Sequence, residues 1–347
     1  MLDHEVPDMF FGWGVPGEEV EDKIKVEELY FDQVVAQNPI SYQARPAKEM
    51  DPVMLKKWND FQASKGLEPE SVDMTLLTEF VFGKKMWWLP QDTGSCVWSN
   101  TFRAVVARML FEIMLKGDPE EWFGDNEFGV KSIAPHMISY GFARQRANMR
   151  GGDGLYCQPM IDSMMKDGFV TCNTPKLKEL MDKAGATRED DYPEPRSTSL
   201  IRRLQNWEFN DALKPYGDFK LQESSRISSG EDLWEALGAF KPAIQCSGIA
   251  IKLAGKDNDG FPIHTRDRST SLAHNMSWQG RRVSKTGKRY VRLSNESWVQ
   301  KNASDETANK YIYTIPLEEA DTWVRSSSVD CMTIGELDLP DSMPVFQ

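Results

Sequence analysis

The apolar pattern that follows Cys96 constrains the fold of this chain more than any other stretch. Apolar side chains recur there every three or four residues, which is the spacing of one face of an α-helix: Phe102, Val105, Val106, Met109, Leu110 and Ile113. Lys116 and Gly117 are typical of a helix end, so the pattern predicts a buried helix of about five turns that begins close to Cys96.

Helical patterns dominate the first half of the chain and strand patterns the second. Further helices are predicted at residues 133–146, 159–166, 175–184 and 231–240, followed by a strand in "KPAIQCSGIAIK". After Lys252, the segments "SLAHNMSWQGRRV", "KRYVRLSNESW" and "KYIYTIPL" have strand character, and "SKTG" is a turn between the first two. Helices followed by a block of strands predict an α+β fold with two segregated lobes, and a cleft between such lobes is the natural place for a site.

Charge and apolar content exclude several classes of function. The chain carries 41 Lys and Arg against 53 Asp and Glu, and its basic residues are dispersed, which argues against a nucleic-acid surface. No run of about 18 apolar residues is present to span a membrane. The first residues also lack the basic start and apolar core of a secretory signal. We therefore expect a soluble protein with no membrane span and no nucleic-acid partner.

The cysteines give no sign of a disulfide framework or a zinc clamp. The chain has an odd number of them with no paired spacing: Cys96, Cys157, Cys172, Cys246 and Cys331. We therefore expect no disulfide framework, no structural metal and a reducing, cytoplasmic compartment.

Cys96 stands where a helix is expected to begin, and this position suits a nucleophile. The unpaired N–H groups and the positive dipole end of a helix start favour the thiolate, which is the form that attacks. The alternative is that Cys96 packs as a small hydrophobic residue, which is the commoner role on such a pattern. A nucleophilic cysteine also needs a base, and the chain offers four histidines: His4, His136, His264 and His274.

His274 is the best placed of these histidines. It begins the strand pattern "SLAHNMSW", and the hairpin returns along "YVRLSNESW", which brings Asn295 back near it. An amide oxygen there can accept the imidazole N–H and fix its tautomer, although a turn residue ending a strand is the alternative for Asn295. The others are expected to be solvated or locally bonded: His4 in the N-terminal region, His136 in a predicted helix and His264 in the polar loop "DNDGFPIHTRDR".

The order Gln91, "GSC", His274, Asn295 and Trp298 resembles the papain-like cysteine peptidases. Three further segments resemble the family in the same order: "SIAPHMISYG", similar to its Ser-x-Gln-x-Leu helix start; "GGDGLYCQPMIDSMMKDGFV", similar to its Gly-Gly loop and following helix; and "GEDLWEALGAFKPAIQCSGI", similar to its helix-then-strand crossing. The resemblance covers about residues 85–317. It implies a papain-like two-lobed fold, with an N-terminal helical lobe, a C-terminal antiparallel β lobe and the active-site cleft between them.

The resemblance also implies roles for single residues. Cys96 would be the nucleophile, His274 the general base and then acid, and Asn295 the residue that orients the imidazole. Gln91 would donate its side-chain amide to the oxyanion, together with the Cys96 backbone N–H. Trp298 would cover the His–Asn hydrogen bond from water. No cofactor and no metal is implied.

On the substrate side, Gly152, Asp153 and Gly154 would border the cleft, where the family presents backbone hydrogen bonds to an extended peptide. The family's disulfide would need cysteines where this chain has Thr93 and Gly151. Both partners are missing together, which agrees with a reducing compartment.

The chain departs from the family pattern around the nucleophile and after the histidine. Gln91 precedes Cys96 by five positions, where the family usually has six, and Val97 stands before Trp98. The shorter spacing moves the side-chain amide of Gln91, the expected oxyanion donor, relative to Cys96. In "NESW", Glu296 lies within what is normally Asn-Ser-Trp, which leaves open whether the amide or the carboxylate faces the histidine.

We divide the chain into an N-terminal extension (1–84), a catalytic domain (85–325) and a C-terminal tail (326–347). The extension has one short helix pattern, which Asp51 can cap and Gly66 can end. It is either a pro-segment, a segment that docks the domain onto a larger assembly through aromatic anchors, or chain packed against its own domain.

The leading hypothesis is a cysteine peptidase that cleaves peptide or isopeptide bonds of a protein substrate through a thioester. A second is a structural or assembly protein that keeps the fold with reduced or lost activity. With unfamiliar flanking sequence and no expected prodomain, the chain resembles the papain-like proteins found in bacteriophage virions and in bacteria. Incorporation into a virion is therefore one expectation. A third hypothesis is a Cys-His amidase that acts on cell-wall peptides.

Overall fold

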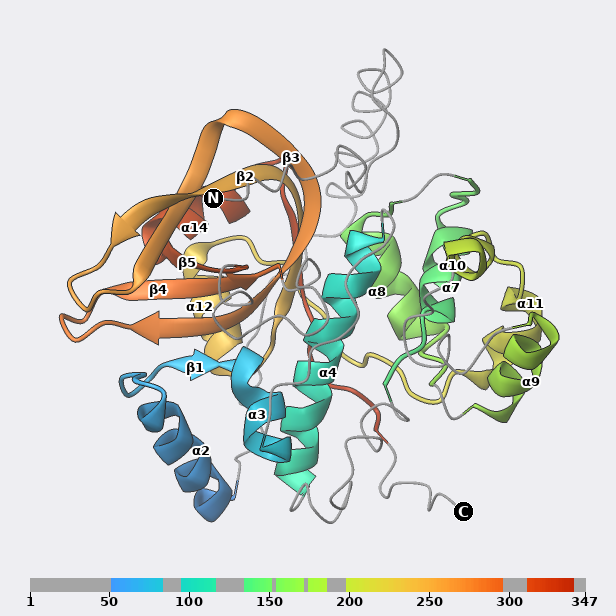
Figure 1. The fold of residues 1–347 in the computed structure, drawn as a ribbon, viewed down its shortest axis with the longest axis horizontal. Coiled ribbons are helices and arrows are strands. Elements are labelled where there is room, and N and C mark those ends of the chain that lie inside the picture. Colours follow the sequence, from blue (N-terminus) through green and yellow to red (C-terminus); the bar gives the residue numbers. More distant parts are fainter. Residues whose placement is uncertain are drawn as a thin grey trace.

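The computed structural model describes residues 51–83, 95–116, 134–151, 154–171, 174–185, 198–295 and 311–339. Within these ranges the chain has an α+β fold in which helix α4 (Cys96–Lys116) lies between a group of helices and an antiparallel sheet (Figure 1). This arrangement confirms the predicted fold class. No helix in the described ranges combines the length and the apolar character needed to cross a membrane.

Helix α4 begins at Cys96 itself, close to the start that the apolar pattern predicts. All its side chains from Cys96 to Met114 are buried, so the burial extends around the whole helix and not only along one apolar face. Charged side chains on the other faces of α4 therefore bond to partners inside the protein. Arg108 Nε donates to Glu112 Oε1 at 2.8 Å, and Arg108 Nη1 donates to the Phe240 carbonyl at 3.0 Å.

On one side of α4 lies a group of helices with a small core of its own. The predicted helices at 133–146, 159–166 and 175–184 correspond to α7, α8 and α9, and two further helices follow: α7 (Ile138–Arg146), α8 (Cys157–Lys166), α9 (Pro175–Lys183), α10 (Thr198–Gln205) and α11 (Asn210–Leu213). Gly141 on α7 lets α10 approach closely, because a Cβ there would clash with the Leu204 carbonyl oxygen.

On the other side of α4 lies a six-stranded antiparallel sheet with the order β5-β4-β3-β2-β6, in which β1 also pairs with β3. Two helices pack against it, α12 (Gly230–Gly238) and α14 (Leu317–Val324) (Figure 1). The strands are β1 (Val72–Asp73), β2 (Ala243–Lys256), β3 (Pro262–Val283), β4 (Arg289–Ser294), β5 (Ile312–Pro316) and β6 (Asp330–Thr333).

The predicted hairpin is confirmed, because β3 pairs with β4 and the "SKTG" turn closes with a bond from Ser284 N to the Lys288 carbonyl. The placement of His264 in a polar loop is wrong. Strand β3 starts at Pro262, so His264 lies within it and is buried. Of the loop expected from the polar sequence, only residues 257–260 form a tight turn. Strand β3 continues through "HTRDR" because β2 pairs with it there.

The described parts of both flanking segments pack onto this domain. Asp51 caps α2 (Pro52–Ser64) by accepting from Val53 N and Met54 N, as predicted. The chain then passes through η1 (Met74–Leu76) and α3 (Leu77–Phe82). Trp58 of α2 has no exposed surface, and β1 pairs with β3. Beyond residue 326, β6 pairs with β2, so the segment expected to be a tail contributes an edge strand.

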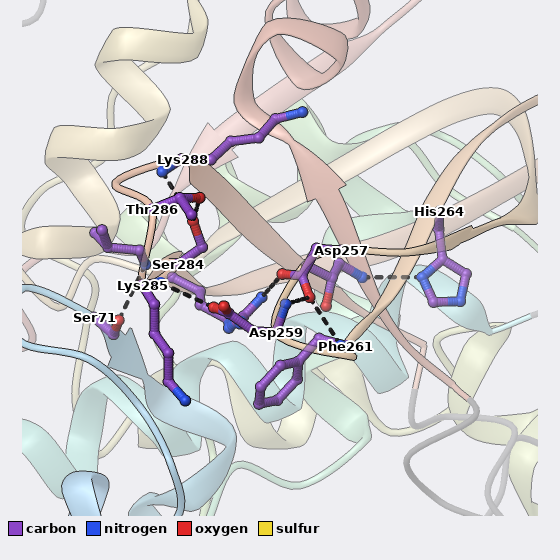
Figure 2. A network of polar contacts seen from close by, with 12 residues as sticks. Ser71, Asp257, Asp259, Phe261, His264, Ser284, Lys285, Thr286 and Lys288 are labelled. Atoms are coloured by element: carbon purple, nitrogen blue, oxygen red, sulfur yellow. Dashed lines mark hydrogen bonds and ion pairs between the residues drawn. The ribbon is translucent and has the colours of Figure 1, made fainter.

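A buried polar network joins the turn between β2 and β3 to the end of β3 (Figure 2). Arg282 donates to Asp257 Oδ2 at 2.6 Å and to Asp259 Oδ2 at 3.1 Å, and its guanidinium lies 3.7 Å from the centre of the Phe261 ring. All three charged side chains are less than a tenth exposed. The network therefore fixes the path of the two longest strands.

Cys157 and Cys246 form a disulfide between the start of α8 and strand β2. The expectation of no disulfide is therefore wrong. The two cysteines are 89 residues apart in the chain, and only the packing of α8 against the sheet brings their Cα atoms to 6.1 Å. Cys96 and Cys331 are free, and Cys172 lies outside the described residues.

Candidate active site

Cys96 is the first residue of α4, and its side chain has no exposed surface. Burial raises the pKa of the thiol to about 11, while backbone hydrogen bonds from Asn275, Val97 and Cys96 itself act in the opposite direction. The helix start thus favours the thiolate, as predicted, but the loss of solvent outweighs it. A pKa of this size favours the neutral thiol over the thiolate at pH 7.

His274 and Asn295 meet at the end of the β3–β4 hairpin. His274 Nε2 lies 2.7 Å from Asn295 Oδ1, and both side chains are 1% exposed. Burial lowers the pKa of His274 to about 4, although the hydrogen bond with Asn295 works against this. An amide oxygen can only accept, so Nε2 carries the hydrogen and Nδ1 holds the lone pair that can take a proton.

Asn100 connects the cysteine to the histidine strand. Its Nδ2 donates to the Cys96 carbonyl at 3.2 Å and to the Asn275 carbonyl at 2.7 Å. Asn100 lies one helical turn after Cys96, on the same face of α4, and Asn275 follows His274 directly. This amide therefore fixes the strand that carries the imidazole against the helix that carries the thiol.

Asn275 extends the same connection to the disulfide. Its Nδ2 lies 3.2 Å from Cys157 Sγ and 3.3 Å from Cys246 Sγ, while its backbone bonds to Cys96 and Asn100. No pattern in the sequence points to Asn100 or Asn275 as a residue of the site. The one signal available was a polar amide inside an otherwise apolar helix pattern.

Chemically, the site holds a thiol at a helix start and an imidazole bonded to an amide oxygen, a set of groups that can serve as a nucleophile, a base and a group that orients the base. The raised pKa of Cys96 and the lowered pKa of His274 both favour the neutral form of the side chain at pH 7. The backbone N–H groups at the start of α4 are the local donors for negative charge. Among the described residues, no group of three or more His, Cys, Asp or Glu side chains gathers to hold a metal.

The remaining predicted site residues are only partly described. Gln91, Gly152, Asp153 and Trp298 lie outside the described residues. Gly154 is buried with a positive φ of 97°, and its carbonyl accepts from Arg144. Glycine is favoured at such a φ because it has no Cβ.

Two other histidines are locally bonded, as expected. His136 Nδ1 accepts from Ile138 N and His264 Nδ1 accepts from Thr314 N, both at 3.2 Å. Burial lowers the pKa of His136 to about 3 and also lowers that of His264. His4 lies outside the described residues.

No family model matches this chain, and no curated protein matches it. Solved structures of cysteine proteases are similar to it at low identity. Xylellain from Xylella fastidiosa is 14% identical, with a TM-score of 0.42 over 85% of this chain and 98% of that one. The ragweed pollen allergen Amb a 11 in its proform is 13% identical, with a TM-score of 0.40 over 93% and 90%. Bromelain from Ananas comosus is 10% identical, with a TM-score of 0.38 over 76% and 98%.

Proposed function

We propose that this chain is a papain-like cysteine peptidase in which Cys96 attacks the carbonyl carbon of a peptide bond. The observation that carries the proposal is the 2.7 Å contact between His274 Nε2 and Asn295 Oδ1, next to a helix-start cysteine that bonds to the backbone of Asn275. A cysteine beside a histidine that an amide orients is the arrangement that acyl transfer to sulfur requires.

In the first half of the reaction, His274 Nδ1 takes the proton of Cys96 Sγ while the sulfur bonds to the carbonyl carbon. The Cys96 backbone N–H, with the Gln91 side chain as the second donor, stabilises the oxyanion. The imidazolium then gives its proton to the leaving amine, the C–N bond breaks and a thioester remains. In the second half, His274 deprotonates a water that hydrolyses the thioester and releases the thiol.

The neutral thiol and imidazole fit general-base catalysis. Burial disfavours the charged form of each group when it is considered alone, as the directions of both pKa shifts show. Proton transfer creates two opposite charges side by side, so each stabilises the other in the same apolar surroundings. The substrate class is a peptide or isopeptide bond, with Gly152, Asp153 and Gly154 beside the extended chain and Trp298 over the His–Asn pair.

A second candidate function is supported by the burial of the site. Cys96 is 0% exposed, so its side chain offers no surface to a substrate in this structure, which favours an assembly protein that keeps this fold without turnover, such as a component of a phage particle.

Labelling of the native chain separates the two functions. We would treat the protein with iodoacetamide or a papain-type epoxide and map the modified cysteines by mass spectrometry. Cys331 is the internal control, because it is also free and buried, at 1% exposure, and lies beside Asp330. The peptidase hypothesis expects faster labelling of Cys96 than of Cys331, and loss of that advantage in His274→Ala. Equal labelling of both thiols would favour the assembly protein.

A further inference from the structure

Tyr313 of strand β5 lies diagonally across from Asn295, on the same face of the sheet. Asn295 N donates to the Tyr311 carbonyl at 2.8 Å, and two residues back along the same register Leu293 stands opposite Tyr313. Side chains on one face of an antiparallel pair recur every second residue, so Asn295 and Tyr313 are diagonal neighbours. Such neighbours are about 7–8 Å apart along the diagonal, which a long aromatic side chain can bridge.

The Asn295 side chain contacts the Tyr313 hydroxyl as well as His274. Burial raises the pKa of that hydroxyl, while a hydrogen bond from the Asn295 side chain acts in the opposite direction. A bond that favours the phenolate is one in which an amide N–H donates to the phenol oxygen. The two ends of the amide are therefore divided between two partners: Oδ1 lies 2.7 Å from His274 Nε2, and the N–H end is directed to Tyr313.

The ring of Tyr313 is itself held in place. It is partly buried against the core, and the His264 ring meets it edge-on, with the ring centres 5.2 Å apart and the planes at 70°. His264 Nδ1 accepts from Thr314 N at 3.2 Å, which attaches this imidazole to the strand that carries Tyr313. A fixed ring keeps its hydroxyl at a fixed point, as an orienting hydrogen bond requires.

The orientation of the amide matters because Asn295 is 1% exposed and lacks water as an alternative partner. Half a turn of the amide would break its bonds to Tyr313 and to His274 together. Its N–H end would then face the imidazole, so His274 Nε2 would have to accept and the ring hydrogen would move to Nδ1. In that tautomer Nδ1 has no lone pair to take a proton from Cys96.

We propose that Tyr313 is a positioning residue of the candidate active site, whose hydroxyl holds the Asn295 amide with Oδ1 toward His274. The imidazole is thereby kept in the tautomer that can accept the thiol proton. The proposal rests on the peptidase function and adds a fourth residue to its cysteine, histidine and asparagine. The effect of Tyr313 on reactivity passes through Asn295.

The tautomer of His274 can be measured without substrate or turnover. In full-length protein labelled with ¹⁵N-histidine, protonated and unprotonated ring nitrogens give separate resonances, and His274→Gln identifies those of His274. We expect the native protein to carry the hydrogen on Nε2. In Tyr313→Phe, which keeps the ring and removes the hydroxyl, the two resonances should move toward each other as the other tautomer becomes populated. Alkylation of Cys96 should slow about ten-fold, the effect of losing one buried hydrogen bond.

Tyr290→Phe is the matched control, because it removes a hydroxyl from the same sheet. Tyr290 stands opposite Pro316, at the other end of the β4–β5 pair from Asn295. This control should change neither the His274 resonances nor the alkylation rate of Cys96. Tyr313→Met also lacks the hydroxyl and should give the same His274 shift as Tyr313→Phe, so the result does not depend on how well one variant folds.

Coupling to Asn295 separates positioning from a structural role. In the Asn295→Ala background, Tyr313→Phe should have no further effect on alkylation of Cys96, because the amide through which it acts is gone. A full ten-fold effect in that background would overturn the proposal. So would a native His274 that carries its hydrogen on Nδ1, or His274 resonances that neither Tyr313 variant changes. These resonances do not depend on thiol chemistry: Cys96 alkylating no faster than Cys331 would reject the peptidase function alone.

Discussion

One side-chain amide, that of Asn100, joins two segments of the site that are 175 residues apart in the chain. It donates to the carbonyl of Cys96 and to the carbonyl that follows His274. Asn100 has no exposed surface, so water cannot replace these bonds without rearrangement. The position of the imidazole relative to the thiol therefore depends on this residue.

We predict that Asn100→Ala destabilises the protein by about 1–3 kcal/mol, because it leaves buried carbonyls without their donor. It should also slow alkylation of Cys96 without changing that of Cys331. Asn100→Asp should do the same, since a carboxylate cannot donate. Urea unfolding and alkylation rates across pH measure both effects. A variant that unfolds more easily yet alkylates Cys96 at the original rate would show a purely structural role.

The disulfide attaches helix α8 to strand β2, and so links the two sides of α4. It closes a loop of 89 residues, and disulfides that close loops of this kind stabilise proteins by about 2–5 kcal/mol. We predict that a thiol reductant lowers the urea midpoint of the native chain by a corresponding amount. The Cys157→Ala, Cys246→Ala double variant is the control and should not respond. A native chain equally stable with and without reductant would contradict this prediction.

The Arg282 network lies where the turn between β2 and β3 meets the end of β3. We predict that Arg282→Met costs about 3–5 kcal/mol, because it leaves Asp257 and Asp259 as unpaired buried charges. Adding Asp257→Asn and Asp259→Asn should recover most of this loss, since no buried charge then remains. Denaturant unfolding of the single and triple variants measures both effects. A triple variant as unstable as Arg282→Met would show that packing against Phe261, and not charge, carries the cost.

The stability of the whole molecule should fall in mild acid. Burial lowers the pKa of His136 to about 3 and that of His274 to about 4, against an ordinary value of 6.5. The unfolded chain therefore binds more protons, and the stability that is fully present above pH 6.5 is lost as the pH falls toward these values. Asp330 opposes this loss, because burial raises its pKa to about 6 and the folded state holds its proton.

With two such histidines against one such carboxyl, we expect a net loss of about 1 kcal/mol per pH unit below pH 6. Urea midpoints at pH 7, 6 and 5 measure the slope. His136→Asn keeps an acceptor for Ile138 N but cannot take up the proton, so its slope should be shallower. An unchanged slope in this variant would mean that His136 is not among the groups responsible.

Local patterns in the sequence determined the elements that carry the candidate site. The apolar spacing after Cys96 predicts α4 and places its start close to Cys96, and the strand patterns on either side of "SKTG" predict the hairpin that returns Asn295 to His274. Both depend on periodicities within about 25 residues, and such periodicities are visible in a single chain. The same reasoning failed at His264, where pairing with β2 extends a strand through polar residues.

Only the tertiary structure decided how these elements meet. The Asn100–Asn275 bond, the Cys157–Cys246 disulfide and the Gly151–Asn206 bond join residues that are 175, 89 and 55 positions apart. Nothing in local spacing encodes such pairs. The charge state of the site was likewise decided by tertiary burial: the helix start at Cys96 favours a thiolate, but packing on all sides removes the solvent that would stabilise it.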